Sequence, residues 1–177
     1  MTQEINSNIR IIHVINGPIT ETITIRPIEE KDNKEIAALI RKVFEEFDAP
    51  KTESVYSDPL TDRLFQSFYQ HPRAGYWVVE YNGSIVGGCG FYPTEGLDTD
   101  CAEIVKFYLS PLLRGKKVGS ALLNMVEEGD ILRKVGGKIE KSGERFEKHG
   151  GVFQIFRRHY ITISQQKCKS SVLLHFV

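Results

Sequence analysis

Seven residues with three positive charges stand between a β-branched, aromatic stretch and an amphipathic one. They are Arg114, Gly115, Lys116, Lys117, Val118, Gly119 and Ser120. The first four N–H groups of a helix have no partner inside it and lie at the positive end of its dipole. The two glycines let a ligand approach the backbone, and the basic side chains add charge. This segment predicts a site for a pyrophosphate or another phosphate, the alternative being a basic helix N-terminus without a ligand.

The elements on either side of this basic turn must position it. Residues 102–109 carry apolar side chains on both faces, which indicates a central strand, and Pro111 ends it because proline has no N–H. Helical spacing then predicts a helix with one apolar face, made of Val118, Ala121, Leu122, Met125 and Val126. Neither GxxxxGK[ST] nor GxGxxG occurs, which excludes a nucleotide P-loop and the Rossmann fingerprint.

The chain before this unit predicts the order β-α-α-β-β-β-α. Asp32, three residues before Glu35, has the spacing of a capping box, and Asp58-Pro59 begins a second helix. Asn82-Gly83 is typical of a hairpin turn, and the glycines at 87, 88 and 90 suggest bulging or close packing. The predicted elements are a strand at 23–28, a helix at 33–47, a helix at 58–71, and strands at 76–81 and 84–92.

The basic turn within this order resembles a known family. The strand, the proline and Arg114-Gly-x-x-x-Gly119-[Ser/Ala]-x-Leu-Leu are similar to the acetyl-CoA signature of the GNAT superfamily of N-acetyltransferases. In the usual pattern, [RQ]-x-x-G-x-[GA], Arg114 and Gly119 match the ends, and Lys117 replaces the middle glycine. The resemblance covers residues 22–128. It implies an α+β, three-layer fold with a central mixed, mostly antiparallel sheet flanked by helices.

The two ends of the chain fit this pattern less closely. We expect residues 1–21 to form an N-terminal arm, in which the apolar run at 9–15 is either a loose extra strand or a poorly ordered segment. Residues 22–177 form one GNAT-like domain, of which 129–177 are atypical. There we expect a polar helix at 140–148 and strands at 152–163 and 171–177. Phe146 stands where the family has a tyrosine, and an altered tail is one hypothesis.

The resemblance implies acetyl-CoA as co-substrate and assigns roles to this chain's residues. Backbone N–H groups near Tyr108 and Leu109 would hold the thioester carbonyl and the pantetheine arm, where a bulge opens the sheet. The residues of the basic turn would bind the diphosphate.

Glu103 is the candidate general base. We expect it to share a strand face with Val105, Phe107 and Leu109, and such apolar surroundings raise a carboxyl pKa. The alternative is a glutamate near solvent or paired with Lys106. A tyrosine often serves the family as general acid. Tyr160 is the candidate here and Tyr108 could also substitute, with a packed aromatic as the alternative for each.

Composition limits the partners. The 23 basic and 23 acidic residues cancel, although residues 129–177 carry a net charge of +6. Three cysteines without a CxxC pair favour a reducing, cytoplasmic location and predict neither disulfides nor a metal site. The absence of a long apolar run predicts no membrane span.

The leading hypothesis is an acetyl-CoA-dependent N-acetyltransferase that moves an acetyl group directly to a primary amine of a small molecule or a protein. A non-catalytic CoA-binding module on the same fold is the alternative. A nucleic-acid-binding protein that uses the basic C-terminal third is a third possibility, and no interleaved aromatic and basic motif supports it. The acceptor, whose loops would fall in residues 48–75 and in the atypical C-terminal part, is not specified, and a homodimer is possible.

Overall fold

The computed structural model describes residues 9–16, 19–48, 51, 54–93, 101–128, 138–149 and 152–162 of the 177. In chain order the elements are β1 (Arg10–Asn16), β2 (Ile19–Pro27), η1 (Glu30–Asp32), α1 (Asn33–Glu46), η2 (Pro59–Arg63), α2 (Leu64–Tyr69), β3 (Gly75–Tyr81), β4 (Ser84–Tyr92), β5 (Cys101–Leu109), η3 (Pro111–Leu113), α3 (Val118–Glu128), β6 (Lys138–His149) and β7 (Val152–Thr162).

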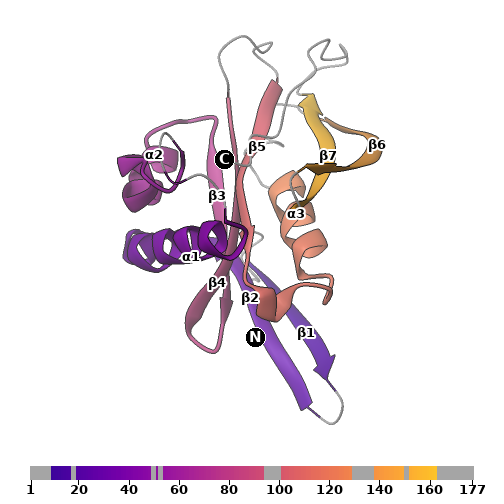
Figure 1. Ribbon diagram of the computed structural model, residues 1–177. Helices are drawn as coiled ribbons and strands as arrows, with labels where there is room; N and C mark the ends of the chain where they lie inside the picture. The colour runs from indigo at the N-terminus through magenta and orange to yellow at the C-terminus, as the bar shows by residue number, and fades with distance from the viewer. Residues whose placement is uncertain are drawn as a thin grey trace, which may run out of the picture.

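The strands form one sheet in the order β1-β2-β3-β4-β5-β7-β6. Helices α1 and α2 cover one face and α3 covers the other (Figure 1). The predicted α+β class with three layers is therefore confirmed. Every strand pair in the described ranges is antiparallel, β5 with β7 included. The parallel component expected of a mixed sheet is not found there, because β7 rather than β6 lies beside β5.

Two apolar clusters fix the helices to the sheet, one on each face. On the α3 side, Val118 and Leu122 are fully buried against strand residues such as Ile25. On the α1 side, Ile36 and Ile40 are fully buried. The apolar spacing seen in both helices is thus the surface that each one buries. Within the described residues, no helix is long and apolar enough to cross a membrane.

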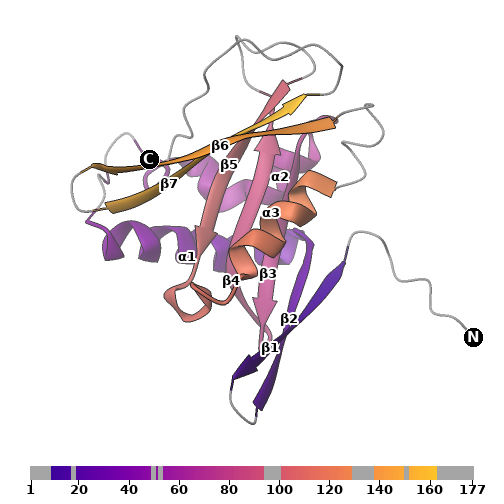
Figure 2. The ribbon, with the colours of Figure 1, turned by 90° about the vertical axis from the view of Figure 1, so that its right-hand side faces the viewer.

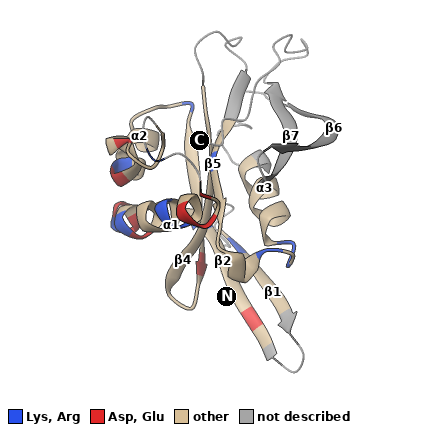
Figure 3. Ribbon diagram, in the orientation of Figure 1, with Lys and Arg blue, Asp and Glu red and all other residues tan. Residues whose placement is uncertain are grey.

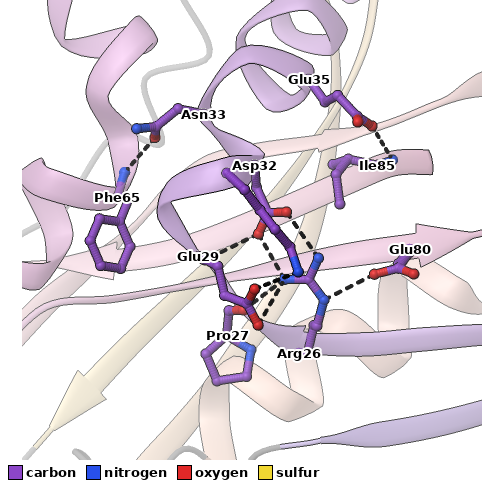
Figure 4. A network of polar contacts seen from close by, with 10 residues as sticks. Arg26, Pro27, Glu29, Asp32, Asn33, Glu35, Phe65, Glu80 and Ile85 are labelled. Carbon is purple, nitrogen blue, oxygen red and sulfur yellow. Dashed lines mark hydrogen bonds and ion pairs between the residues drawn. The ribbon is translucent and has the colours of Figure 1, made fainter. Parts of the chain in front are cut away.

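The start of α1 differs from the predicted capping box. Asp32 makes no side-chain cap of α1; its carboxylate instead accepts two bonds from the Arg26 guanidinium, at 2.7 and 2.9 Å. Burial raises the pKa of Asp32, but the Arg26 hydrogen bonds and the Glu29 N–H outweigh it, so the net shift is downward. Figure 4 shows Arg26 between Asp32 and Glu80. Asp32 therefore pairs with a buried arginine on β2 rather than with the first turn of α1.

The β3–β4 hairpin forms at the predicted turn. Asn82 and Gly83 both have positive φ, 50° and 75°, which is the geometry that tight hairpins need. The glycines of β4 are closely packed, as predicted: a Cβ on Gly88 would lie 2.5 Å from the Tyr76 hydroxyl oxygen. The register shifts once in the β3–β4 pair and once in the β4–β5 pair.

The elements near the two ends of the chain differ in part from those predicted from the sequence. The predicted helix at 140–148 is wrong, since these residues lie in β6 and pair with β7. Strand β7 itself confirms the strand predicted at 152–163, and it ends one residue earlier. Cross-strand pairing overrode a polar segment's weak helix propensity. The loose extra strand near the N-terminus is β1, which pairs with β2 along its whole length. The boundary at residue 21 stays a prediction, and the strand at 171–177 lies outside the described residues.

Candidate active site

The basic turn leads into α3 where the sequence predicts. Ser110 caps η3, and α3 begins at Val118. Ala121 N–H donates to the Lys117 carbonyl, 3.1 Å, but the N–H groups of residues 117–120 have no acceptor among the described residues. Gly115, with φ +75°, has no atom near its missing Cβ, whereas Gly119 packs close to Phe107. Free amides at the positive end of a helix suit an anionic group.

Lys117 occupies a left-handed backbone position, with φ +61°. Glycine adopts this conformation at no steric cost, whereas another residue loses about 1–2 kcal/mol. The lysine therefore keeps the backbone path that a glycine would take, and its side chain is exposed. The departure from the family pattern changes the charge here more than the shape of the turn.

Arg114 faces α1 rather than open solvent. Its Nε donates to the Leu109 carbonyl at 3.0 Å, and its guanidinium pairs with both oxygens of Glu46. The same group lies 5.0 Å from the centre of the Phe47 ring. Arg114 thus connects the end of β5 to the end of α1.

Lys116 is held by an acid from β2. Its Nζ lies 3.1 Å from the Glu21 carboxylate, which also accepts the Tyr81 hydroxyl at 2.7 Å. The bond from Tyr81, then that from Lys116, lowers the pKa of Glu21. Figure 3 shows the basic residues of the turn as blue segments beside the start of α3. Of the three cations, two are therefore shared with carboxylates, and Lys117 has no ion pair among the described residues.

Strand β5 has a bulge. Gly88 pairs with Tyr108 and Gly90 pairs with Val105, so Lys106 and Phe107 have no partner on β4, and Lys106 has φ +51°. The predicted opening of the strand is thus present. On its other edge, the described part of the chain pairs β5 with β7 only at residues 101 and 102 (Figure 2).

The bulge corrects one expectation about Glu103. Val105 packs against the α1-side cluster, whereas Phe107 and Leu109 pack against the α3-side cluster, because the extra residue reverses the alternation of faces. The four residues therefore do not share one face. Glu103 pairs with Tyr92 in the register, and its side chain lies outside the described part of the structure.

Tyr160 and Tyr108 lie on different strands. Tyr160 is on β7, opposite Glu140, and its side chain is also outside the description. Tyr108 packs against Phe44, 6.1 Å between ring centres, and burial raises the pKa of its hydroxyl well above the usual range. Tyr108 is therefore neutral at physiological pH.

Tyr76, beside the bulge, was not singled out by the sequence, and Asp58 and Lys106 were named there only as a helix start and as a possible partner of Glu103. Tyr76 donates to the Lys106 carbonyl at 2.9 Å, and the Lys106 Nζ lies 3.7 Å from Asp58. Desolvation lowers the pKa of Lys106, and Asp58 partly opposes the shift. An uninterrupted hairpin would place Tyr76 opposite Cys89. The register shift at Val79 places it opposite Gly90 instead.

Comparisons with known proteins agree with this geometry. Residues 40–141, more than half of the chain, match the model of the Acetyltransferase (GNAT) family. The chain belongs to this family. The acetyltransferase class and acetyl-CoA as co-substrate, both expected from the resemblance, follow from that membership.

Individual relatives support the same assignment. The chain is 38% identical over 116 residues to the uncharacterized N-acetyltransferase YjgM of Escherichia coli (strain K12), covering 64% of this chain and 68% of that protein. A GNAT acetyltransferase from Staphylococcus aureus Mu50 has TM-score 0.57 at 18% identity, over 80% of this chain and 99% of that one. PaiA N-acetyltransferase of Thermoplasma acidophilum, solved with coenzyme A, has TM-score 0.51 at 18% identity, over 79% and 98%. These two structures show the fold.

Proposed function

We propose that this GNAT protein transfers the acetyl group of acetyl-CoA directly to a primary amine of a small molecule or a protein. The observation that carries the proposal is the continuous unit from β5 to α3. A bulged strand, which pairs with β7 only at residues 101 and 102 within the described ranges, leads within a few residues to a helix start whose amides have no described acceptor. This arrangement suits one extended ligand with a thioester at one end and a diphosphate at the other.

The diphosphate would be bound by the residues of the basic turn. The amides of residues 117–120 and the exposed Lys117 are available to it, and Arg114 and Lys116 add charge that their carboxylate partners partly offset. The pantetheine arm would follow the backbone at Tyr108 and Leu109. Gly115 leaves the backbone open because nothing lies within 4 Å of its missing Cβ.

In the transfer itself, the amine nitrogen attacks the thioester carbonyl carbon, the C–N bond forms and the C–S bond breaks. We assign the proton that the amine loses to Glu103, and the proton that the leaving thiolate gains to Tyr160. Both assignments rest on the family resemblance and on position in β5 and β7.

Titration calorimetry with acetyl-CoA, followed by detection of free thiol in the presence of an amine panel, tests the proposal. We expect binding in the micromolar range and thiol release that depends on an amine. Glu103→Gln should keep binding and lose turnover, with Glu30→Gln, on the exposed start of η1, as the matched control. Absence of binding at millimolar acetyl-CoA would overturn the proposal.

A non-catalytic CoA-binding module is the second candidate. It is favoured by Phe146, which stands where the family has a tyrosine and which lies on β6. Binding of acetyl-CoA without thiol release across the whole amine panel would support it. The cytoplasm and a homodimer stay predictions, which cell fractionation and light scattering of the purified protein would test.

A further inference from the structure

The bulge in β5 needs a support. Lys106 is held at φ +51°, a left-handed conformation that is strained for a non-glycine residue, and the register gives it no partner on β4. A backbone in such a conformation persists only where surrounding groups hold it. The neighbouring strands should therefore contain a group that contacts the peptide after Lys106.

Tyr76 is that group. Its side chain is 2% exposed, and its hydroxyl donates to the Lys106 carbonyl at 2.9 Å. The ring reaches from β3 across β4 over two glycines: a Cβ on Gly88 would lie 2.5 Å from the hydroxyl oxygen, and one on Gly90 would lie 2.6 Å from the ring. Phe68 packs against the ring, 5.0 Å between centres. The ring therefore has one position, and that position requires both glycines.

The hydrogen bond to the Lys106 carbonyl also orients the N–H group of the same peptide. A trans peptide is planar, and its C=O and N–H point in opposite directions. The described residues contain no cis peptide bond. A hydroxyl that holds the Lys106 carbonyl therefore also directs the Phe107 N–H to the opposite side, away from Tyr76. Tyr108 and Leu109, by contrast, are in register with Gly88 and Gly87.

We propose that Tyr76 is a positioning residue for acyl transfer: it fixes the Lys106–Phe107 peptide and thereby aims the Phe107 N–H at the thioester carbonyl oxygen. The proposal rests on the proposed function. A donor held in place before reaction stabilises the charge that develops on that oxygen, so its alignment acts on the chemical step more than on binding.

The kinetic experiment compares Tyr76→Phe with Ile36→Val. The two changes are of similar size, since one removes a hydrogen bond and the other removes a methyl group in the same cluster. We expect kcat to fall about tenfold in Tyr76→Phe with KM for acetyl-CoA within twofold, and both constants to stay within twofold in Ile36→Val. Equal kcat in the two variants at matched stability would overturn the proposal.

A second readout does not depend on turnover. The ¹H–¹⁵N signal of Phe107 should shift in Tyr76→Phe but not in Ile36→Val. Gly88→Ala should produce the same change at Phe107 because its Cβ displaces the hydroxyl. An unchanged Phe107 signal in Tyr76→Phe would overturn the proposal even for a protein that turns over. Failure of the wild-type protein to bind acetyl-CoA would instead count against the proposed function.

Discussion

Two groups of ion pairs in this protein have similar chemistry and different surroundings. Arg26 and Asp32 lie between β2 and α1, with side chains only 11% and 3% exposed. Arg114 and Glu46 lie beside the basic turn and are about one third exposed. A buried charge cannot lose its partner without a large cost, whereas an exposed one can exchange its partner for water or a ligand. The first pair therefore serves the fold, and the second is free to serve binding.

The largest effect should follow from Asp32→Asn, which leaves the buried Arg26 guanidinium with weaker acceptors. We expect a loss of about 3 kcal/mol in the free energy of unfolding, measured by urea denaturation. The control is Asp62→Asn, which breaks the two-bond pair with Arg41 at an exposed site and should cost less than about 1 kcal/mol. Equal losses in the two variants would contradict the comparison.

Acid should remove the same contribution. The folded state lowers the pKa of Asp32, so its contribution to stability is complete above the ordinary aspartate pKa and is lost as pH falls through the lowered value. Urea denaturation at a series of pH values below 5 should show a steeper loss of stability in the wild-type protein than in Asp32→Asn. Parallel curves for the two proteins would show that protonation of Asp32 does not cause the loss of stability.

The exposed pair should affect binding more than stability. Glu46→Gln removes a negative charge from Arg114 and should change stability by less than about 1 kcal/mol. It should tighten acetyl-CoA binding about threefold at low salt, with a smaller effect at high salt. Glu45→Gln is the matched control, since the neighbouring Glu45 pairs with Lys51 and Tyr56 instead. Calorimetry at two salt concentrations measures the acetyl-CoA affinity of both variants. A larger gain in affinity in Glu45→Gln would refute the role of the Arg114–Glu46 pair in binding.

A small effect on stability, of opposite sign, is expected at Lys117. Lys117→Gly relieves a left-handed backbone and should stabilise the fold by up to about 1 kcal/mol, with Asn82→Gly at a similar φ gaining less because asparagine tolerates this conformation. Acetyl-CoA affinity should fall about threefold at low salt, because the exposed cation is lost. Tighter binding by the glycine variant would instead mean that the lysine crowds the diphosphate.

The sequence by itself determined the elements with strong local signals. The start of α3 at Val118, the turn at Asn82-Gly83 and the strand that ends before Pro111 follow from helix periodicity, positive φ and the missing proline N–H. Each of these signals acts within a few residues, so a neighbour in the chain is enough to specify it. The order of these elements, with the basic turn in place, also identified the family.

Only the tertiary structure decided which side chains meet across strands. The bulge at Lys106 and the shift after Val79 each add one residue to one strand, which reverses faces and changes partners beyond that point. Asp32 found Arg26 instead of capping α1, residues 140–148 joined β7 instead of forming a helix, and Tyr76 reached Lys106 across β4. These outcomes depend on contacts between distant segments, whose energies local periodicity does not encode.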